Sequence, residues 1–203
     1  MKALYVTDRS AIGDARFEAT LAALRGAPGL AVELREKAGG DRETMRRAES
    51  ARETLGPDVP LLVNARMDVA VAAGASGVHL PADGLPLLRV RAAAPRGFLV
   101  GRSTHSPAEA ARAIEEGADL VVLGPIFDTP SKRAYGPPLG TGALEALPLR
   151  AEHDSDVYAI GGVGEAELES LAAFRDRIAG IAAVRLFQES PDPRAVVERI
   201  AGL

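Results

Sequence analysis

Two hydroxyl groups and an amine follow an apolar segment near the middle of the chain, and this combination of groups suits an anion. Residues 120–123 form an unbroken apolar run of strand length, which Gly124-Pro125 ends, and Thr129, Ser131 and Lys132 follow in the next loop. A buried parallel strand that carries such groups at its carboxyl end is typical of a phosphate-binding loop. The alternative interpretation is an ordinary polar surface loop, because short motifs also match by chance.

The segment 30–37 carries three ionisable side chains at alternate positions. Glu33, Arg35 and Lys37 are spaced two residues apart, so in a strand they project to the same side. On an exposed sheet that side would face water, and the pattern would indicate little. In a parallel barrel that side is the interior, where a charge is unfavourable unless it serves a ligand.

Other predicted strand ends also carry groups that bind anions. The glycine pair Gly161-Gly162 ends the segment 156–162, and Arg185 ends the segment 180–185. Glycine lets backbone N–H groups approach an anion closely, although a tight turn alone also requires glycine. Arg185 either clamps a phosphate with two hydrogen bonds or fills the pocket and blocks it. The candidate substrate- and phosphate-binding residues are Arg35, Lys37, Asn64, Ser103, Thr129, Ser131, Lys132, Gly161, Gly162 and Arg185.

A regular framework must position these side chains. Strand patterns occupy 3–8, 30–37, 59–64, 76–81, 98–101, 120–123, 156–162 and 180–185, and helical patterns occupy 14–25, 41–55, 67–73, 87–94, 107–116, 142–147, 165–174 and 192–201. Ser106 as N-cap and Pro107 at the first helical position mark the clearest helix start. The alternation predicts an α/β fold, a single compact (β/α)8 TIM barrel over residues 1–203, with a doubly wound sheet as the alternative. In such a barrel the loops after the strands build the active site.

The composition limits the classes of function. Apolar residues make up 47% of the chain and charged residues 26%, which are values of a globular protein. The net charge of −4, with scattered lysines and arginines, argues against a nucleic-acid partner. The absence of cysteine excludes disulfides, thiolate catalysis and zinc–thiolate sites. We find no signal peptide and no apolar stretch of about 18 residues, so we expect a cytoplasmic protein without a membrane partner.

Six stretches of the chain match one known family jointly, in order and at the family's spacing. They are residues 33–37 (ELREK), 62–68 (LVNARMD), 77–80 (GVHL), 101–105 (GRSTH), 124–132 (GPIFDTPSK) and 159–163 (AIGGV). On these motifs the chain resembles the thiamin phosphate synthase/TenI family over nearly its full length. The resemblance implies a (β/α)8 barrel that acts in thiamin biosynthesis and forms a homodimer. The synthase joins a pyrimidine diphosphate to a thiazole phosphate with magnesium present, whereas TenI converts a thiazole carboxylate phosphate to its aromatic tautomer without metal.

The chain departs from the synthase pattern where magnesium would bind. The resemblance places the pyrophosphate-binding pair on Arg35 and Lys37, but the glutamine that opens that motif is Glu33 here. The two metal-binding aspartates of the synthase fall on Ala65 and Gly84. Magnesium is usually held by one or two carboxylates together with phosphates, so we expect no metal site. If the synthase alternative holds, magnesium is the cofactor, with unconventional ligands such as Asp83 and Asp8.

The stretch from Leu80 to Ser106 is more similar to TenI. A histidine that some TenI proteins carry in the loop after the sixth strand falls on Pro125, so another residue must move the proton. The candidates are His105, His79 and Glu33, and we choose His105 as the catalytic residue because a histidine at a strand end suits a general base. The alternatives are that His105 only supports its loop and that His79 is a satisfied barrel histidine. We expect His153, in a polar connection, at the surface.

Three hypotheses for the function follow. The first is a metal-independent, TenI-like thiazole tautomerase that binds a small-molecule thiazole phosphate at the C-terminal face of the barrel. The second is a thiamin phosphate synthase that releases pyrophosphate. The third is a barrel that binds thiazole phosphate or thiamin phosphate without catalysis.

Overall fold

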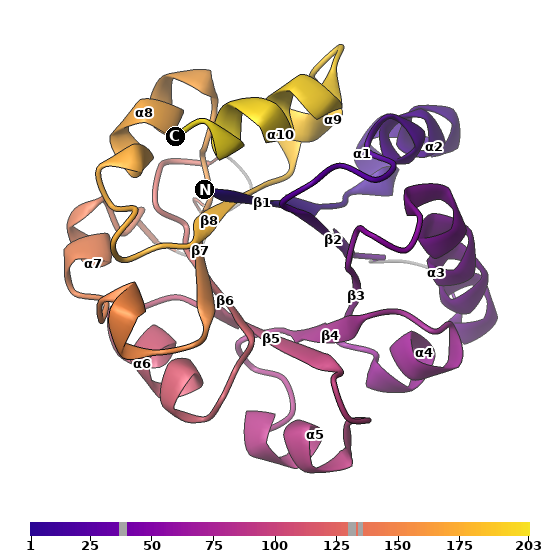
Figure 1. Cartoon of the computed structure of the whole chain (residues 1–203), viewed down its shortest axis with the longest axis horizontal. Helices are drawn as coiled ribbons and strands as arrows, with labels where there is room; N and C mark the ends of the chain where they lie inside the picture. The colour runs from indigo at the N-terminus through magenta and orange to yellow at the C-terminus, as the bar shows by residue number, and fades with distance from the viewer. Residues whose placement is uncertain (37–39, 130–132, 134–135) are drawn as a thin grey trace.

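Eight parallel strands form a closed barrel in chain order, with the helices outside it (Figure 1). The computed structural model describes residues 1–36, 40–129, 133 and 136–203. The strands are β1 (Lys2–Val6), β2 (Leu30–Leu34), β3 (Leu61–Asn64), β4 (Gly77–Leu80), β5 (Leu99–Thr104), β6 (Leu120–Leu123), β7 (Asp156–Ile160) and β8 (Gly180–Ala183). Because β1 pairs with β8, for example Leu4 with Ala182, the barrel prediction is confirmed and the doubly wound sheet is wrong.

The helices that follow the strands form the outer layer in Figure 1. They are α1 (Arg9–Ile12), α2 (Asp14–Ala23), α3 (Asp41–Leu55), α4 (Met67–Ala72), α5 (Leu87–Ala93), α6 (Pro107–Glu115), α7 (Gly142–Glu145), the 3-10 turn η2 (Arg150–Glu152), α8 (Glu165–Ala172), α9 (Arg185–Gln188) and α10 (Pro193–Ala201). The expected cap of α6 is confirmed, since Ser106 Oγ accepts a hydrogen bond from Glu109 N. In the described part of the chain, no helix combines the length and apolarity needed to cross a membrane.

The strand predicted over 30–37 is shorter than expected. β2 ends at Leu34, and the N–H of Arg35 donates to Thr7 Oγ1 (2.9 Å) instead of joining the ladder. Because β1 ends at Val6, the acceptor for Arg35 N is the side-chain hydroxyl of Thr7 and not a backbone carbonyl of β1. Arg35 thus lies beyond the alternation on which its predicted inward direction depended.

Two other boundaries also differ. β5 runs to Thr104, which pairs with Leu123 of β6, so Ser103 belongs to a strand and not to the loop predicted after Gly101. β8 ends at Ala183, and Arg185 opens the short helix α9. Helices of four residues, such as α1 and α9, are too short to show a helical period in the sequence.

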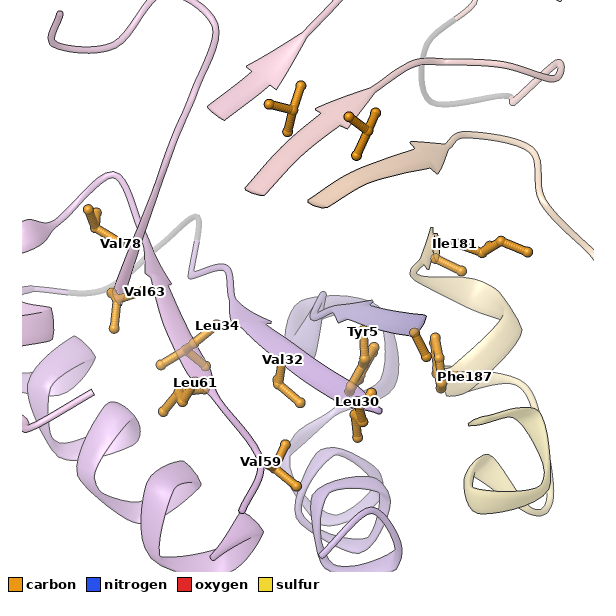
Figure 2. Packing of buried hydrophobic residues seen from close by; sticks show 14 of the residues in the cluster. Tyr5, Leu30, Val32, Leu34, Val59, Leu61, Val63, Val78, Ile181 and Phe187 are labelled. Carbon is orange, nitrogen blue, oxygen red and sulfur yellow. The ribbon is translucent and has the colours of Figure 1, made fainter. Parts of the chain in front are cut away.

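The main apolar core lies between the barrel and its helices. Strand residues whose side chains point outward, such as Val32, Leu61 and Ile181, pack in this layer, part of which Figure 2 shows. At the junction of β1 with α9, the rings of Tyr5 and Phe187 lie 5.2 Å apart. This layer fixes the strands and therefore the direction of their ends.

A second, smaller core fills the barrel itself. Its members alternate along the strands with those of the outer core, as a barrel interior requires, and include Leu4, Leu62, Val122, Tyr158 and Ala182. The inward positions on β2 to β5 continue toward the C-terminal end with polar side chains, which are Glu33, Asn64, His79 and Ser103. The barrel interior is thus apolar below and polar on one side of its C-terminal mouth.

Replacing Leu62 by alanine tests how far the interior core supports the barrel. Leu62 is 1% exposed, so the truncation should leave a cavity and lower the free energy of unfolding by about 3 kcal/mol in a urea titration. The matched control is Leu88→Ala on α5, where leucine is 60% exposed, with an expected change below about 0.5 kcal/mol. Equal losses in the two variants would contradict this description of the core.

Candidate functional site

The described candidate residues lie at or just after the C-terminal ends of six strands, including Arg185 after β8. Asn64 is the last residue of β3, and Ser103 lies next to the end of β5. Thr129 follows β6, and Arg35 follows β2 directly. Gly161-Gly162 follows β7. The predicted residues Lys37, Ser131 and Lys132 lie outside the described residues. The barrel thus brings the described groups to one face.

The glycine pair after β7 meets the loop after β6 at very short range. Gly161 and Gly162 have φ angles of +98° and +67°, in the region that favours glycine. A Cβ atom on Gly162 would lie 2.4 Å from the carbonyl oxygen of Asp128, and Phe127 N donates to Gly161 O at 2.9 Å. The tight-turn interpretation of these glycines therefore has direct structural support. The same left-handed glycines are also compatible with anion binding by backbone N–H groups.

His105 lies just beyond the end of β5 with an exposed ring. Its Nδ1 is 2.7 Å from the carbonyl oxygen of Gly124, at the end of β6. A carbonyl only accepts hydrogen bonds, so Nδ1 carries the hydrogen and Nε2 keeps a free lone pair. The same contact supports the loop, as the alternative interpretation proposed. A ring held in this tautomer suits a general base as well.

A buried polar cluster lies further inside the barrel mouth, on β2, β4 and β5. His79 Nε2 is 2.9 Å from Ser103 Oγ and 3.9 Å from Glu33 Oε2. Glu33 is 4% exposed and His79 is 1% exposed. Among the described residues, His79 Nδ1 has no hydrogen-bond partner, so the expectation of a satisfied barrel histidine is wrong.

Gly101 makes room for this cluster, and the sequence analysis missed its role. It pairs with His79 across β4 and β5, and a Cβ atom at Gly101 would lie 2.4 Å from His79 Nδ1. Any other residue would displace the imidazole. A glycine inside a strand, which often marks such a close approach, was the available signal.

The side chains of the two candidate arginines, Arg35 and Arg185, are not paired with described residues of the protein. The side chains of Arg35 and Arg185 make no hydrogen bond or ion pair with any residue that the structure describes. Arg185 is exposed at the start of α9, and an exposed guanidinium does not fill a pocket. Both charges are therefore available to an anion.

His153 does not lie at the surface as expected. Its side chain is half-buried, and both ring nitrogens lack a hydrogen-bond partner among the described residues. It lines a pocket between α6 and the connection that follows α7, together with Ala111, Ile114 and Leu147. The flanking polar residues Glu152 and Asp154 concealed this burial in the sequence.

The comparisons with known proteins agree on one family. The family model described as thiamine monophosphate synthase (TMP-TENI) matches residues 3–187. The chain belongs to the thiamine monophosphate synthase/TenI family. It is 42% identical over 184 residues to a thiamine-phosphate synthase from Methanoculleus marisnigri, covering 89% of this chain and 86% of the relative.

Further relatives carry related names. A thiamine-phosphate synthase from Methanoregula boonei is 40% identical, with 89% of this chain and 84% of the relative covered. The solved thiamine phosphate pyrophosphorylase from Pyrococcus furiosus is 25% identical, with a TM-score of 0.81 that covers 99% of this chain and 94% of the other. The family resemblance found in the sequence is thus confirmed.

The donor atoms at the rim of β3 and β4 do not suit the family's magnesium. The resemblance places the two metal-binding aspartates of the synthase on Ala65 and Gly84, whose side chains carry no oxygen ligand. Arg66, which follows Ala65, forms ion pairs with both Asp41 (2.5 Å) and Asp68 (2.6 Å). Its guanidinium lowers the pKa of Asp68 to about 2. Among the described residues, no group of three or more His, Asp or Glu side chains lies together.

Ala65 has a backbone that alanine rarely adopts. Its φ angle is +61°, and the N–H of Arg66 donates to the carbonyl of Asn64 at 2.8 Å, which forms a tight turn around it. Ala65 N also donates to His79 O, so the turn is tied to β4. Residue 65, where the resemblance places a magnesium ligand, thus lies in a strained turn and has no side chain that could bind the metal.

Alanine substitution of Gly162 tests the close approach of the two loops. Gly162→Ala combines a left-handed φ with overlap on Asp128 O, whereas Gly97→Ala has a similar φ (+77°) and no atom within 4 Å of its new Cβ. The control should lower the free energy of unfolding by about 1 kcal/mol, and Gly162→Ala by about 2 kcal/mol more. Chemical denaturation measures both. A difference near zero would mean that the loops do not pack as described.

Proposed function

We propose that this chain is a metal-independent, TenI-like enzyme that relocates a proton on a thiazole phosphate. The observation that carries the proposal is the pair Ala65 and Gly84, which leaves the rim without the two carboxylates of the magnesium-dependent synthase. A tautomerisation needs no leaving group and therefore no metal to neutralise one. It needs an anion site and groups that exchange protons.

The chain offers the groups that such a reaction requires. The phosphate of the substrate would bind the backbone N–H groups of Gly161-Gly162 and the side chain of Arg185, and its carboxylate would bind Arg35. Thr129, Ser131, Lys132, Lys37, Asn64 and Ser103 complete the proposed binding residues, of which Lys37, Ser131 and Lys132 rest on the sequence motif alone.

The proton transfer itself is assigned to His105. The hydrogen bond from Nδ1 to Gly124 O leaves the lone pair of Nε2 free to accept a proton from the thiazole. The C–H bond at one carbon breaks, and a proton returns to another carbon of the same conjugated system, so the reaction is a balanced isomerisation. General acid–base catalysis of this kind contributes roughly 10² to 10⁴ in rate.

A thiamin phosphate synthase is the second candidate. It is favoured by the names of the relatives from Methanoculleus marisnigri and Methanoregula boonei, which are 40–42% identical over most of the chain. In that case magnesium is the cofactor, and ligands other than residues 65 and 84 must hold it. A binding protein without catalysis is the third candidate. Cytoplasmic localisation and a homodimer stay predictions in all three cases.

A turnover assay with and without chelator tests the proposal. The purified protein should convert the thiazole carboxylate phosphate tautomer to its aromatic form at the same rate in EDTA and in magnesium. His105→Gln should lower kcat at least about 100-fold, because glutamine cannot accept the proton, and should change the Kd for the thiazole phosphate less than about 3-fold.

The other candidates give different results in the same experiment. Coupling of pyrimidine diphosphate to thiazole phosphate that stops in EDTA would identify a synthase and contradict the proposal. Tight thiazole phosphate binding with no turnover in either assay would identify a binding protein. Full activity of His105→Gln would support the tautomerase activity but would show that His105 is not its general base.

A further inference from the structure

Glu33 is a buried carboxyl group that receives no hydrogen bond from any residue that the structure describes. Its side chain is 5% exposed, and its Oε2 lies 3.9 Å from His79 Nε2, beyond hydrogen-bonding distance. In the described part of the chain it forms no other polar contact, including none with Arg35. A buried carboxyl group without partners is unfavourable unless it serves a ligand.

The imidazole beside Glu33 is fixed in one tautomer. His79 Nδ1 faces Gly101 and has no acceptor among the described residues, so a hydrogen on that atom would be buried without a partner. The hydrogen therefore belongs on Nε2, which faces both Ser103 Oγ (2.9 Å) and Glu33 Oε2 (3.9 Å). One N–H group serves the nearer oxygen, and the Glu33 carboxyl remains free for something else.

The position of the cluster connects it with the site already described. Glu33, His79 and Ser103 face inward near the C-terminal ends of β2, β4 and β5, and His79 pairs with Asn64 across β3 and β4. His105 lies two residues beyond Ser103 along the chain, at the end of the same strand. The C-terminal mouth of the barrel therefore holds two groups of a type that can exchange protons. They are the exposed imidazole of His105 and the buried carboxyl group of Glu33.

We propose that Glu33 is the second proton-transfer group of the enzyme, with His79 as its positioning residue, and that it delivers a proton to a thiazole phosphate as the aromatic tautomer forms. This inference rests on the proposed function. His105 Nε2 accepts the proton from the C–H bond that breaks, and the Glu33 carboxyl delivers a proton to the carbon where the new C–H bond forms. The two groups return to their starting states by exchanging one proton through water, so no oxidant or reductant is needed.

Glu33→Gln is the variant that isolates this role. Glutamine keeps the volume and the polar contact but neither accepts nor donates the proton, and the synthase pattern has glutamine at this position. We expect kcat for the thiazole tautomerisation to fall at least 100-fold, with the Kd for thiazole phosphate within about 3-fold of the wild-type value. The urea midpoint should change little, because one buried polar side chain replaces another and no hydrogen bond from a described residue to Glu33 is lost.

Glu36→Gln is the matched control. Glu36 lies three residues further along, with a side chain that is also buried (6% exposed), but it is bound to Arg9 at 3.0 Å and not to the cluster. Its kcat should stay within about 3-fold of the wild-type value. A loss as large as that of Glu33→Gln would mean that any buried charge near this strand end affects the rate, and would overturn the inference.

His79 is tested by a pair of variants. His79→Gln keeps an N–H donor near Ser103 and Glu33, and should retain kcat within about 10-fold, whereas His79→Leu should lose about 100-fold. Equal loss in both would contradict a positioning role.

The failures of the two proposals can be told apart. Wild-type protein without tautomerase turnover overturns the proposed function and this inference together. An active wild type with an equally active Glu33→Gln overturns the inference alone.

Discussion

Closure of the barrel through β1 and β8 brings eight strand ends into one ring, so the inward side chains near that ring lie in one shared interior. On β6, β7, β8 and β1 the inward positions are apolar and belong to the interior core. On β2 to β5 they are Glu33, Asn64, His79 and Ser103, and this cluster is incompletely hydrogen-bonded. The same closure that stabilises the fold therefore keeps reactive groups buried on one side of the mouth.

The proposed tautomerisation rests on the groups that this mouth contains and on the carboxylates that its rim lacks. A tautomerisation of a ring requires anchors for an anion and sites for a proton, and both kinds of group are present on the described strands. Departure of pyrophosphate requires a cation that neutralises it, and Arg66 already binds Asp41 and Asp68 beside the rim. The sequence departures at residues 33, 65 and 84 thus point in one chemical direction, although the relatives carry the synthase name.

Much of the fold could be predicted from the sequence, because strands and helices alternate with clear periods and because Ser106 caps α6 as expected. The end of β2 could not be predicted. It depends on the hydroxyl of Thr7, which accepts the hydrogen bond of Arg35 N in place of a backbone carbonyl. The local sequence of His153 also misled, because its burial comes from elements that pack against it from elsewhere.

The site was predicted in part. The strand-end residues were found from their types and spacing, but the partners of His79 and Glu33 depend on the barrel register. Gly101 is the clearest case: a glycine inside a strand signals a close approach, but only the barrel register identifies the ring of His79 as the group that lies there.

Calorimetric titration of the purified protein tests the central claim most directly, with thiazole carboxylate phosphate and pyrimidine diphosphate as separate ligands, each with and without magnesium. A metal-independent thiazole phosphate site predicts binding of the first ligand with the same Kd in magnesium and in EDTA, and weak or no binding of the second. Magnesium-dependent binding of the diphosphate would contradict the account, because it would show that the chain holds the metal without carboxylates at residues 65 and 84.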